Sequence, residues 1–123
     1  MPHELKQWPA SVYPDETEEF PEAKPDIDVA LLELHRRGPS PLGYQVKALG
    51  KGKGGLWQMN LRVERKQIRI LYAPYKDSIV VFRIHKKGSP QEQQRAYKLA
   101  MSRKKEAEAL MKGGTHVNSL ILH

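Results

Sequence analysis

The chain has 123 residues, of which 39% are hydrophobic and 28% are charged. This size and composition fit one compact domain over 1–123 and exclude wholesale disorder. It contains no cysteine, which excludes disulfides and thiolate chemistry. No apolar run approaches the roughly 20 residues that span a bilayer, and the first residues lack the apolar core of a signal peptide. We therefore expect a cytoplasmic protein with a proline-rich segment at 1–25, a tail at 113–123 and no membrane partner.

The charge is unevenly distributed along the chain. Residues 1–34 hold nine of the 14 acidic residues and two of the 21 basic ones, a net charge of −7. Residues 35–123 therefore carry +14, and the whole chain +7. A strongly basic segment indicates a polyanionic partner, because each phosphate contact releases condensed counterions. The alternative is a solvated basic surface that keeps a small protein soluble.

The N-terminal third mixes weak and clear signals. A short strand is expected over Leu5–Tyr13, at a sheet edge because its proline cannot donate to a ladder. One acidic helical turn is expected over Asp15–Phe20. A helix should then begin at Asp26 or Asp28 as N-cap and end before Gly38. Its apolar positions recur at helical spacing: Ile27, Ala30, Leu31 and Leu34.

The connector Ser40–Gly55 has no strong periodicity. A short helix or an extended piece is expected over Tyr44–Leu49, followed by the glycine- and lysine-rich run Gly50–Gly55. That run lacks the ending and the strand-to-helix setting of a P-loop. A phosphate-contacting loop and a flexible linker both remain open.

The clearest pattern lies between Leu56 and Lys86. Apolar and polar residues alternate over 57–63 and over 67–73, and a third strand is expected over 78–85. Short turns at 64–66 and 74–77 connect them, which predicts an antiparallel three-strand meander.

A long helix should follow the meander. Ser89 is the expected N-cap and Pro90 the first helical residue, with the helix running to about Lys112. Its basic run Arg103-Lys104-Lys105 is expected to be a solvated face. The tail Thr115–His123 could add a strand or stay mobile. The fold class is thus α+β, an antiparallel sheet with a three-strand meander, an N-terminal helix or helices and a long C-terminal helix.

One polar surface is expected on the sheet, because residues two apart on a strand share a face. Its candidates are Gln58, Asn60, Arg62, Arg69, Arg83 and His85 or Lys86. Guanidinium and ammonium groups on one face can hold a scissile phosphate and neutralise the charge that develops on it. RNA supplies its own 2′-OH nucleophile. The five histidines show no metal-ligand spacing, so we expect neither a metal nor another cofactor.

Each candidate also has a structural interpretation. Arg69 could pair with Glu64 or Asp77 on the strand surface. His85 could donate a proton, contact phosphate or be an ordinary strand-end histidine. Trp57, like Tyr97, is expected in the core rather than as a base-stacking platform.

The order of these motifs resembles the RelE/ParE toxin superfamily, and within it the HigB-like, phage-derived branch. The resemblance covers about Asp26–Lys112. The matching residues are Gly55-Leu56-Trp57, Arg69-Ile70-Leu71-Tyr72, Lys86-Lys87, Pro90 and Ala100–Arg103.

The resemblance implies the toxin of a type II toxin–antitoxin system, an endoribonuclease that cleaves mRNA on the ribosome without a metal and so blocks translation. Its implied partners are mRNA, the ribosome and a cognate antitoxin, often a small helix-turn-helix protein. Arg69 matches the family's strand arginine, and Lys86 and Lys87 match its paired lysines. The predicted catalytic residues are Arg69, Lys86 and His85. The predicted RNA-binding residues are Arg62, Arg83, Lys87, Lys51, Lys53 and Lys66.

The sequence departs from the family at Gln58 and Asn60, where the family favours Glu and Arg. A second interpretation is therefore a non-catalytic binding module: a degenerate toxin, a ParE-like gyrase inhibitor or a phage nucleic-acid-binding protein. A third is a chain that acts only by joining an antitoxin complex on DNA.

Overall fold

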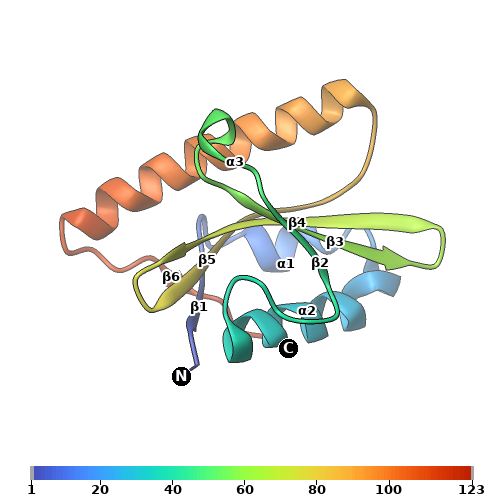
Figure 1. Ribbon diagram of the computed structural model, residues 1–123, viewed down its shortest axis with the longest axis horizontal. Coiled ribbons are helices and arrows are strands. Elements are labelled where there is room, and N and C mark those ends of the chain that lie inside the picture. Colours follow the sequence, from blue (N-terminus) through green and yellow to red (C-terminus); the bar gives the residue numbers. More distant parts are fainter. Residues whose placement is uncertain (1, 123) are drawn as a thin grey trace.

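The computed structural model describes residues 2–122 and combines one mixed sheet with helices on both of its faces (Figure 1). The elements in chain order are β1 (Glu4–Gln7), α1 (Val12–Glu16), η1 (Pro21–Ala23), α2 (Lys24–Arg37), β2 (Gln45–Ala48), η2 (Lys51–Lys53), β3 (Trp57–Val63), β4 (Lys66–Tyr75), β5 (Ser78–Lys86), α3 (Pro90–Lys112) and β6 (Asn118–Ser119). The strand order across the sheet is β2-β3-β4-β5-β1-β6. The α+β class, the antiparallel meander and the long C-terminal helix are as predicted, but the sheet as a whole is only mostly antiparallel, because β1 and β5 pair in parallel.

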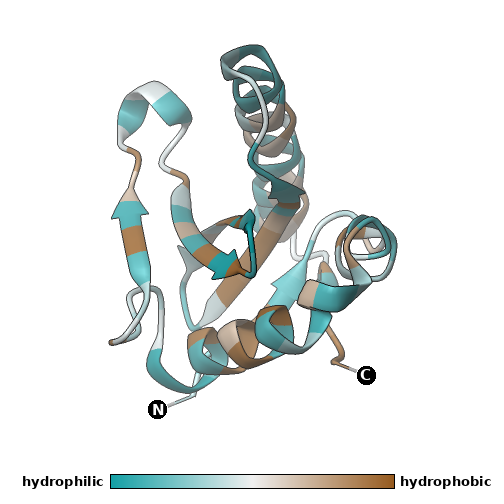
Figure 2. Cartoon of the chain, turned by 90° about the vertical axis from the view of Figure 1, so that its right-hand side faces the viewer, coloured by the Kyte–Doolittle hydropathy of each residue, from teal (hydrophilic) through white to brown (hydrophobic). Residues whose placement is uncertain are grey.

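The meander β3-β4-β5 forms the centre of the sheet. Both of its connections are two-residue turns whose first residues, Glu64 and Lys76, have φ of 57° and 53°. Positive φ at this position matches the twist of the flanking strands, which is why short hairpin loops adopt it. The alternation of residue types along these strands, visible in Figure 2, assigns one set of side chains to each face of the sheet.

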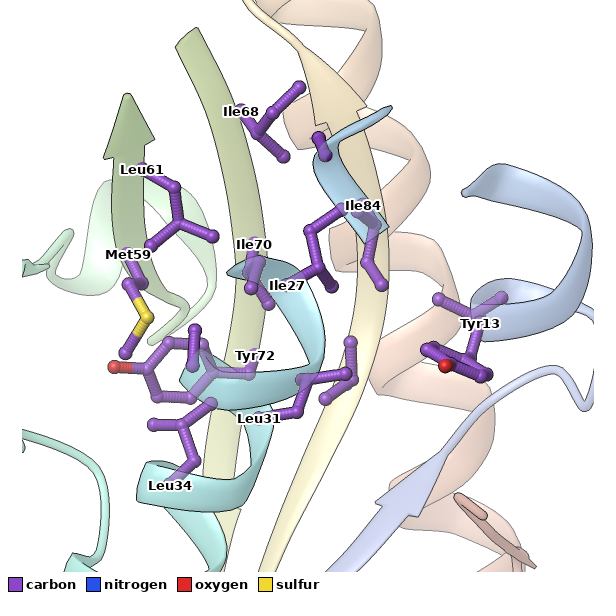
Figure 3. Packing of buried hydrophobic residues seen from close by; sticks show 14 of the residues in the cluster. Tyr13, Ile27, Leu31, Leu34, Met59, Leu61, Ile68, Ile70, Tyr72 and Ile84 are labelled. Atoms are coloured by element: carbon purple, nitrogen blue, oxygen red, sulfur yellow. The ribbon is translucent and has the colours of Figure 1, made fainter. Parts of the chain in front are cut away.

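The main core lies between the sheet and α2. Ile27, Leu31 and Leu34 of α2 are fully buried and point at the sheet, where they meet residues of all three meander strands (Figure 3). The strand residues that Figure 3 labels in this layer are Met59, Leu61, Ile68, Ile70, Tyr72 and Ile84. Burying a single leucine or isoleucine side chain stabilises the fold by about 1.5–3 kcal/mol, so this layer is the dominant stabilising one.

A second, smaller core lies on the opposite face, under α3. It contains Leu71, Val80 and Phe82 from the strands and Leu56, which directly precedes β3. From α3 it takes mostly small residues: Ala96, Ala100 and Ala107. Small side chains let the helix lie close to the sheet, so polar groups between them are removed from water.

The N-terminal elements differ from the predictions. The first strand ends at Gln7 and pairs in parallel with β5 on one side and with β6 on the other, so it is not at a sheet edge. The helical turn expected over Asp15–Phe20 lies earlier, at Val12–Glu16. The next helix begins at Lys24, with Ala23 rather than an aspartate as N-cap, because the preceding 3-10 turn continues directly into it.

Later elements agree more closely with the predictions. The piece around Tyr44–Leu49 is extended, as β2. Ser89 is the N-cap of α3, and its hydroxyl accepts a hydrogen bond from the amide of Glu92. The tail adds the short strand β6.

Candidate nucleic-acid interface

A β-bulge in β5 determines which of its side chains face α3. Leu71 of β4 pairs with Arg83, whereas the next residue, Tyr72, pairs with Val81, so that Phe82 is the extra residue. A bulge of this kind changes the alternation of the strand beyond it. Arg83 therefore joins the face that carries Leu71, and His85 faces the same side.

Beyond the bulge, β5 forms one wall of an open cleft of about 430 Å³. The start of α3 forms another wall, and Glu19, from the segment after α1, closes the rim. The other lining residues are Arg83, His85, Lys86, Lys87, Gly88, Glu92, Arg95, Ala96 and Leu99. Four cationic side chains thus face two carboxylates, so the cleft is net positive and attracts anions. Of the predicted site residues, the structure brings Arg83, His85, Lys86 and Lys87 together here.

Glu16 organises the wall beside Arg83. β1 pairs only with the first half of β5, so the edge of β5 near Ile84 has no neighbouring strand. Glu16 takes that place: its Oε1 accepts a hydrogen bond from the Ile84 amide at 2.9 Å and pairs with Arg83 Nη1 at 3.1 Å. Its Oε2 accepts from Arg103 Nη1 at 2.7 Å, and that same nitrogen donates to the carbonyl of Phe82 at 2.6 Å. A single carboxylate thus fixes the strand edge and two guanidinium groups.

His85 is buried at the floor of the cleft and is 6% exposed. Burial and, to a smaller extent, the positive charges of Arg83 and Arg69 lower its pKa to about 4, against an opposing hydrogen bond to the Lys86 carbonyl. The imidazole is therefore neutral at pH 7 and can accept a proton. Its Nε2 and the Nε atoms of Arg69 and Arg83 are buried without a hydrogen-bond partner among residues 2–122. The unpaired Nε–H donors of the two arginines favour the binding of an anion. His85 Nε2 is instead a proton acceptor, because the Nδ1–H of the neutral ring donates to the Lys86 carbonyl.

Arg69 lies beside this cleft rather than in its lining. In the sheet register it pairs with His85 on one side and Asn60 on the other. Among the described residues it makes no ion pair, so the pairing with Glu64 or Asp77 that the sequence allowed is absent. Its guanidinium is half-buried in the layer that α3 covers.

The neutral residues of the same face form a chain of hydrogen bonds under α3. The Tyr97 hydroxyl donates to Gln58 Oε1 at 2.7 Å, and Gln58 Nε2 donates to Asn60 Oδ1 at 3.1 Å. Trp57 is half-buried against the main core and Tyr97 against the second one, which agrees with the core positions expected for both.

The other predicted RNA-binding residues lie outside the cleft. Arg62 is exposed on β3 and lines a separate hollow near β2. Lys66 pairs with Glu22 of η1. Lys53 donates to Gln94 of α3 at 3.2 Å and lies 4.9 Å from the ring centre of Tyr97. The glycine-rich loop is therefore attached to α3 through Lys53, while the neighbouring Lys51 is exposed.

Four residues of the site were not predicted from the sequence. Glu16, Glu19 and Glu92 supply the carboxylates and Arg95 supplies a fourth cation. The capping position of Glu92, three residues after Ser89, is a local signal that could have placed it at the start of α3. The two N-terminal glutamates reach the site only through tertiary structure, and the sequence carries no local signal for that.

Comparisons with known proteins assign no family. No family model matches the chain, no curated protein matches it, and no solved structure matches its fold. Among residues 2–122, no helix is both long and apolar enough to cross a membrane. Over the same residues, no three His, Cys, Asp or Glu side chains gather as a metal site would require.

Proposed function

We propose that this chain is an mRNA endoribonuclease toxin of the RelE/ParE superfamily, in the HigB-like branch, which cleaves mRNA on the ribosome without a metal and is neutralised by a cognate antitoxin. The observation that carries the proposal is the cleft at the end of β5, where four cationic side chains converge beside a buried neutral histidine. Such a cleft can bind a phosphodiester and stabilise the charge of its transition state. The order of motifs and elements also supports the resemblance.

In the proposed reaction, the 2′-oxygen of RNA attacks the adjacent phosphorus. The O2′–P bond forms and the P–O5′ bond breaks, and the departing 5′-oxygen takes up a proton from solvent water. The products are a 2′,3′-cyclic phosphate and a 5′-hydroxyl. His85, neutral in the free protein, takes the proton of the 2′-OH. Arg83 and Lys86 neutralise the phosphate oxygens. Because bound phosphate is negative, it opposes the effect of the neighbouring arginines on the pKa of His85 and makes the imidazole a stronger base.

The alternative is a non-catalytic nucleic-acid-binding module, and one observation favours it. Gln58 and Asn60, which replace the charged residues that the family favours, are bonded to each other and to Tyr97 under α3. Their side chains therefore offer RNA neither charge nor a proton-transfer group. A binding module would bind RNA with a strong salt dependence and leave it intact.

Expression in bacterial cells separates the two functions. The cleft variant is Arg83→Gln with Lys86→Gln, and the matched control is Arg36→Gln with Lys47→Gln. The control loses the same charge at exposed sites on α2 and β2. Wild type and control should arrest growth and create new mRNA 5′ ends, whereas the cleft variant should lose about 100-fold or more of the cleavage. Absence of new 5′ ends with wild type, or a fully active cleft variant, would refute the enzyme proposal.

The proposal of a cognate antitoxin is tested by co-expressing the reading frame next to the gene of this chain. Its co-expression should restore growth, and its product should co-purify with the chain. Recovery of no small partner would count against the toxin–antitoxin assignment. It would count equally against a chain that acts only by joining an antitoxin complex on DNA.

A further inference from the structure

The solvent side of α3 carries a row of positive charge. Positions 95, 98, 102, 105, 109 and 112 are all exposed, and their spacing of three and four places them on one face of the helix. Four of the six are cationic, namely Arg95, Lys98, Lys105 and Lys112, and the other two are Ser102 and Ala109. We call this row the α3 ridge. At 1.5 Å per residue it extends along about 25 Å of rigid helix.

The charges of the α3 ridge are not neutralised by the fold. Neighbouring cations of the same helix are neutralised by carboxylates: Arg103 pairs with Glu16, and Lys104 pairs with Glu108 at 2.7 Å. Among residues 2–122, no ion pair or side-chain hydrogen bond involves a ridge cation. The basic run that the sequence assigned to a solvated face is therefore divided, and of its three residues only Lys105 belongs to the ridge.

Acidic residues gather on the other side of the sheet. η1 and α2 lie on the face opposite α3 (Figure 1), and α1 lies beside the edge of β5. The exposed acids of this N-terminal segment that lie away from the cleft include Asp15, Glu18, Glu22 and Asp26, whereas Glu19 lies at the rim of the cleft. This separation of charge orients the molecule in the field of a polyanion, with the α3 ridge towards it.

The chemistry of the ridge identifies the kind of polyanion. It carries no aromatic side chain, so it offers no stacking surface for the unpaired bases of a single strand. The apolar side of α3 is buried against the sheet, which leaves no apolar face to enter a membrane. A straight row of flexible cations fits the regular phosphates of a double helix and reads no sequence.

We propose that the α3 ridge docks on the phosphate backbone of double-helical RNA next to the cleft. Arg95 belongs to both surfaces, because it also lines the cleft. The choice of RNA over DNA rests on the proposed function. The ridge holds structured RNA, while the cleft receives the single strand that is cut.

Salt-dependent binding tests the proposal. The probe is an RNA hairpin of about 16 base pairs, and fluorescence anisotropy is measured between about 50 and 200 mM salt. The ridge variant is Lys98→Gln, Lys105→Gln and Lys112→Gln. The control is Arg36→Gln, Lys47→Gln and Lys76→Gln, at exposed positions off α3. Both variants lower the net charge from +7 to +4, and circular dichroism verifies that both are folded.

The ridge variant should reduce the slope of log affinity against log salt by about 2.7, or about 0.9 for each lysine. Its loss of affinity across that salt range should be about 40-fold smaller than that of wild type, while the control keeps nearly the wild-type slope. Equal slopes for the two variants would overturn the proposal. So would an equal effect on a single-stranded probe, or tighter binding to duplex DNA of the same sequence.

The cleft variant, Arg83→Gln with Lys86→Gln, separates this inference from the proposed function. It should abolish cleavage in cells yet bind the hairpin with the ridge contribution intact. Loss of the ridge contribution in that variant would contradict the docking surface. A wild-type chain that cleaves nothing while its ridge still determines the salt slope would overturn the proposed function alone.

Discussion

Replacing Glu16 with glutamine should destabilise the protein strongly. The change keeps an amide oxygen for the Ile84 N–H but removes the carboxylate that Arg83 and Arg103 share. The side chains are 11% exposed for Glu16, 26% for Arg83 and 16% for Arg103. Removing one partner of a buried ion pair costs about 3–5 kcal/mol. Because Arg83 is partly exposed and solvent screens its charge, we expect a cost at the lower end, about 3 kcal/mol. For a chain of this size that corresponds to a fall in Tm of roughly 10 °C.

Urea unfolding measures the cost, and a second change tests its cause. Adding Arg103→Met to Glu16→Gln removes one of the two stranded charges and should restore about 1 kcal/mol or more. The matched control is Glu33→Gln, which breaks an i,i+4 pair with the 60% exposed side chain of Arg37 and should cost less than about 0.5 kcal/mol. If Glu16→Gln costs no more than this control, the charges are screened by solvent and the reasoning fails.

Three further predictions concern the layer between α3 and the sheet. Tyr97→Phe removes the hydroxyl that serves the buried amide of Gln58 and should cost about 1–2 kcal/mol in urea unfolding; an unchanged midpoint would show that the amide finds another partner. Because His85 has a pKa of about 4 in the fold against 6.5 unperturbed, its contribution is complete above pH 6.5 and lost as pH falls towards 4. Near pH 5, wild type should therefore lose about 2 kcal/mol relative to its stability at pH 7, a loss that His85→Gln should not show. Gly88→Ala places a methyl group 2.2 Å from Glu92 Oε2, the far end of a flexible side chain. The carboxylate should move aside and change the stability by less than about 0.5 kcal/mol, because the Ser89 hydroxyl accepts from the backbone amide of Glu92 rather than from its carboxylate. A fall in Tm as large as that expected for loss of a helix cap would contradict this reasoning.

Elements with local signals could be predicted from the sequence. The meander follows from period-two alternation broken by short turns, and α3 follows from its serine cap and first-turn proline. The parallel pairing of β1 with β5 could not be predicted in this way, because it joins residues more than 70 positions apart. A short strand with a neighbouring proline resembles an edge strand until the tail adds β6 beside it.

The residues of the candidate site also differ in whether the sequence carries a local signal for them. Arg83, His85, Lys86 and Lys87 are close in sequence, so one strand and its exit bring them together. Glu16 comes from a different element, and only folding places it beside them. Charge alone predicts Lys66 and Lys53 as RNA-binding residues, but the structure gives both of them partners outside the cleft.

The bulge in β5 explains why the cleft is polar although the strand is mostly apolar. Strict alternation from Ile79 would place Arg83 and His85 in the main core under α2 and turn Ile84 towards α3. A guanidinium in that core would lose its hydration without a partner, which costs far more than one irregular pair in a ladder. With Phe82 as the extra residue, Ile84 enters the main core and both polar side chains face the cleft. The sequence of β5 therefore requires the bulge, and the bulge creates the polar wall on which the proposed chemistry depends.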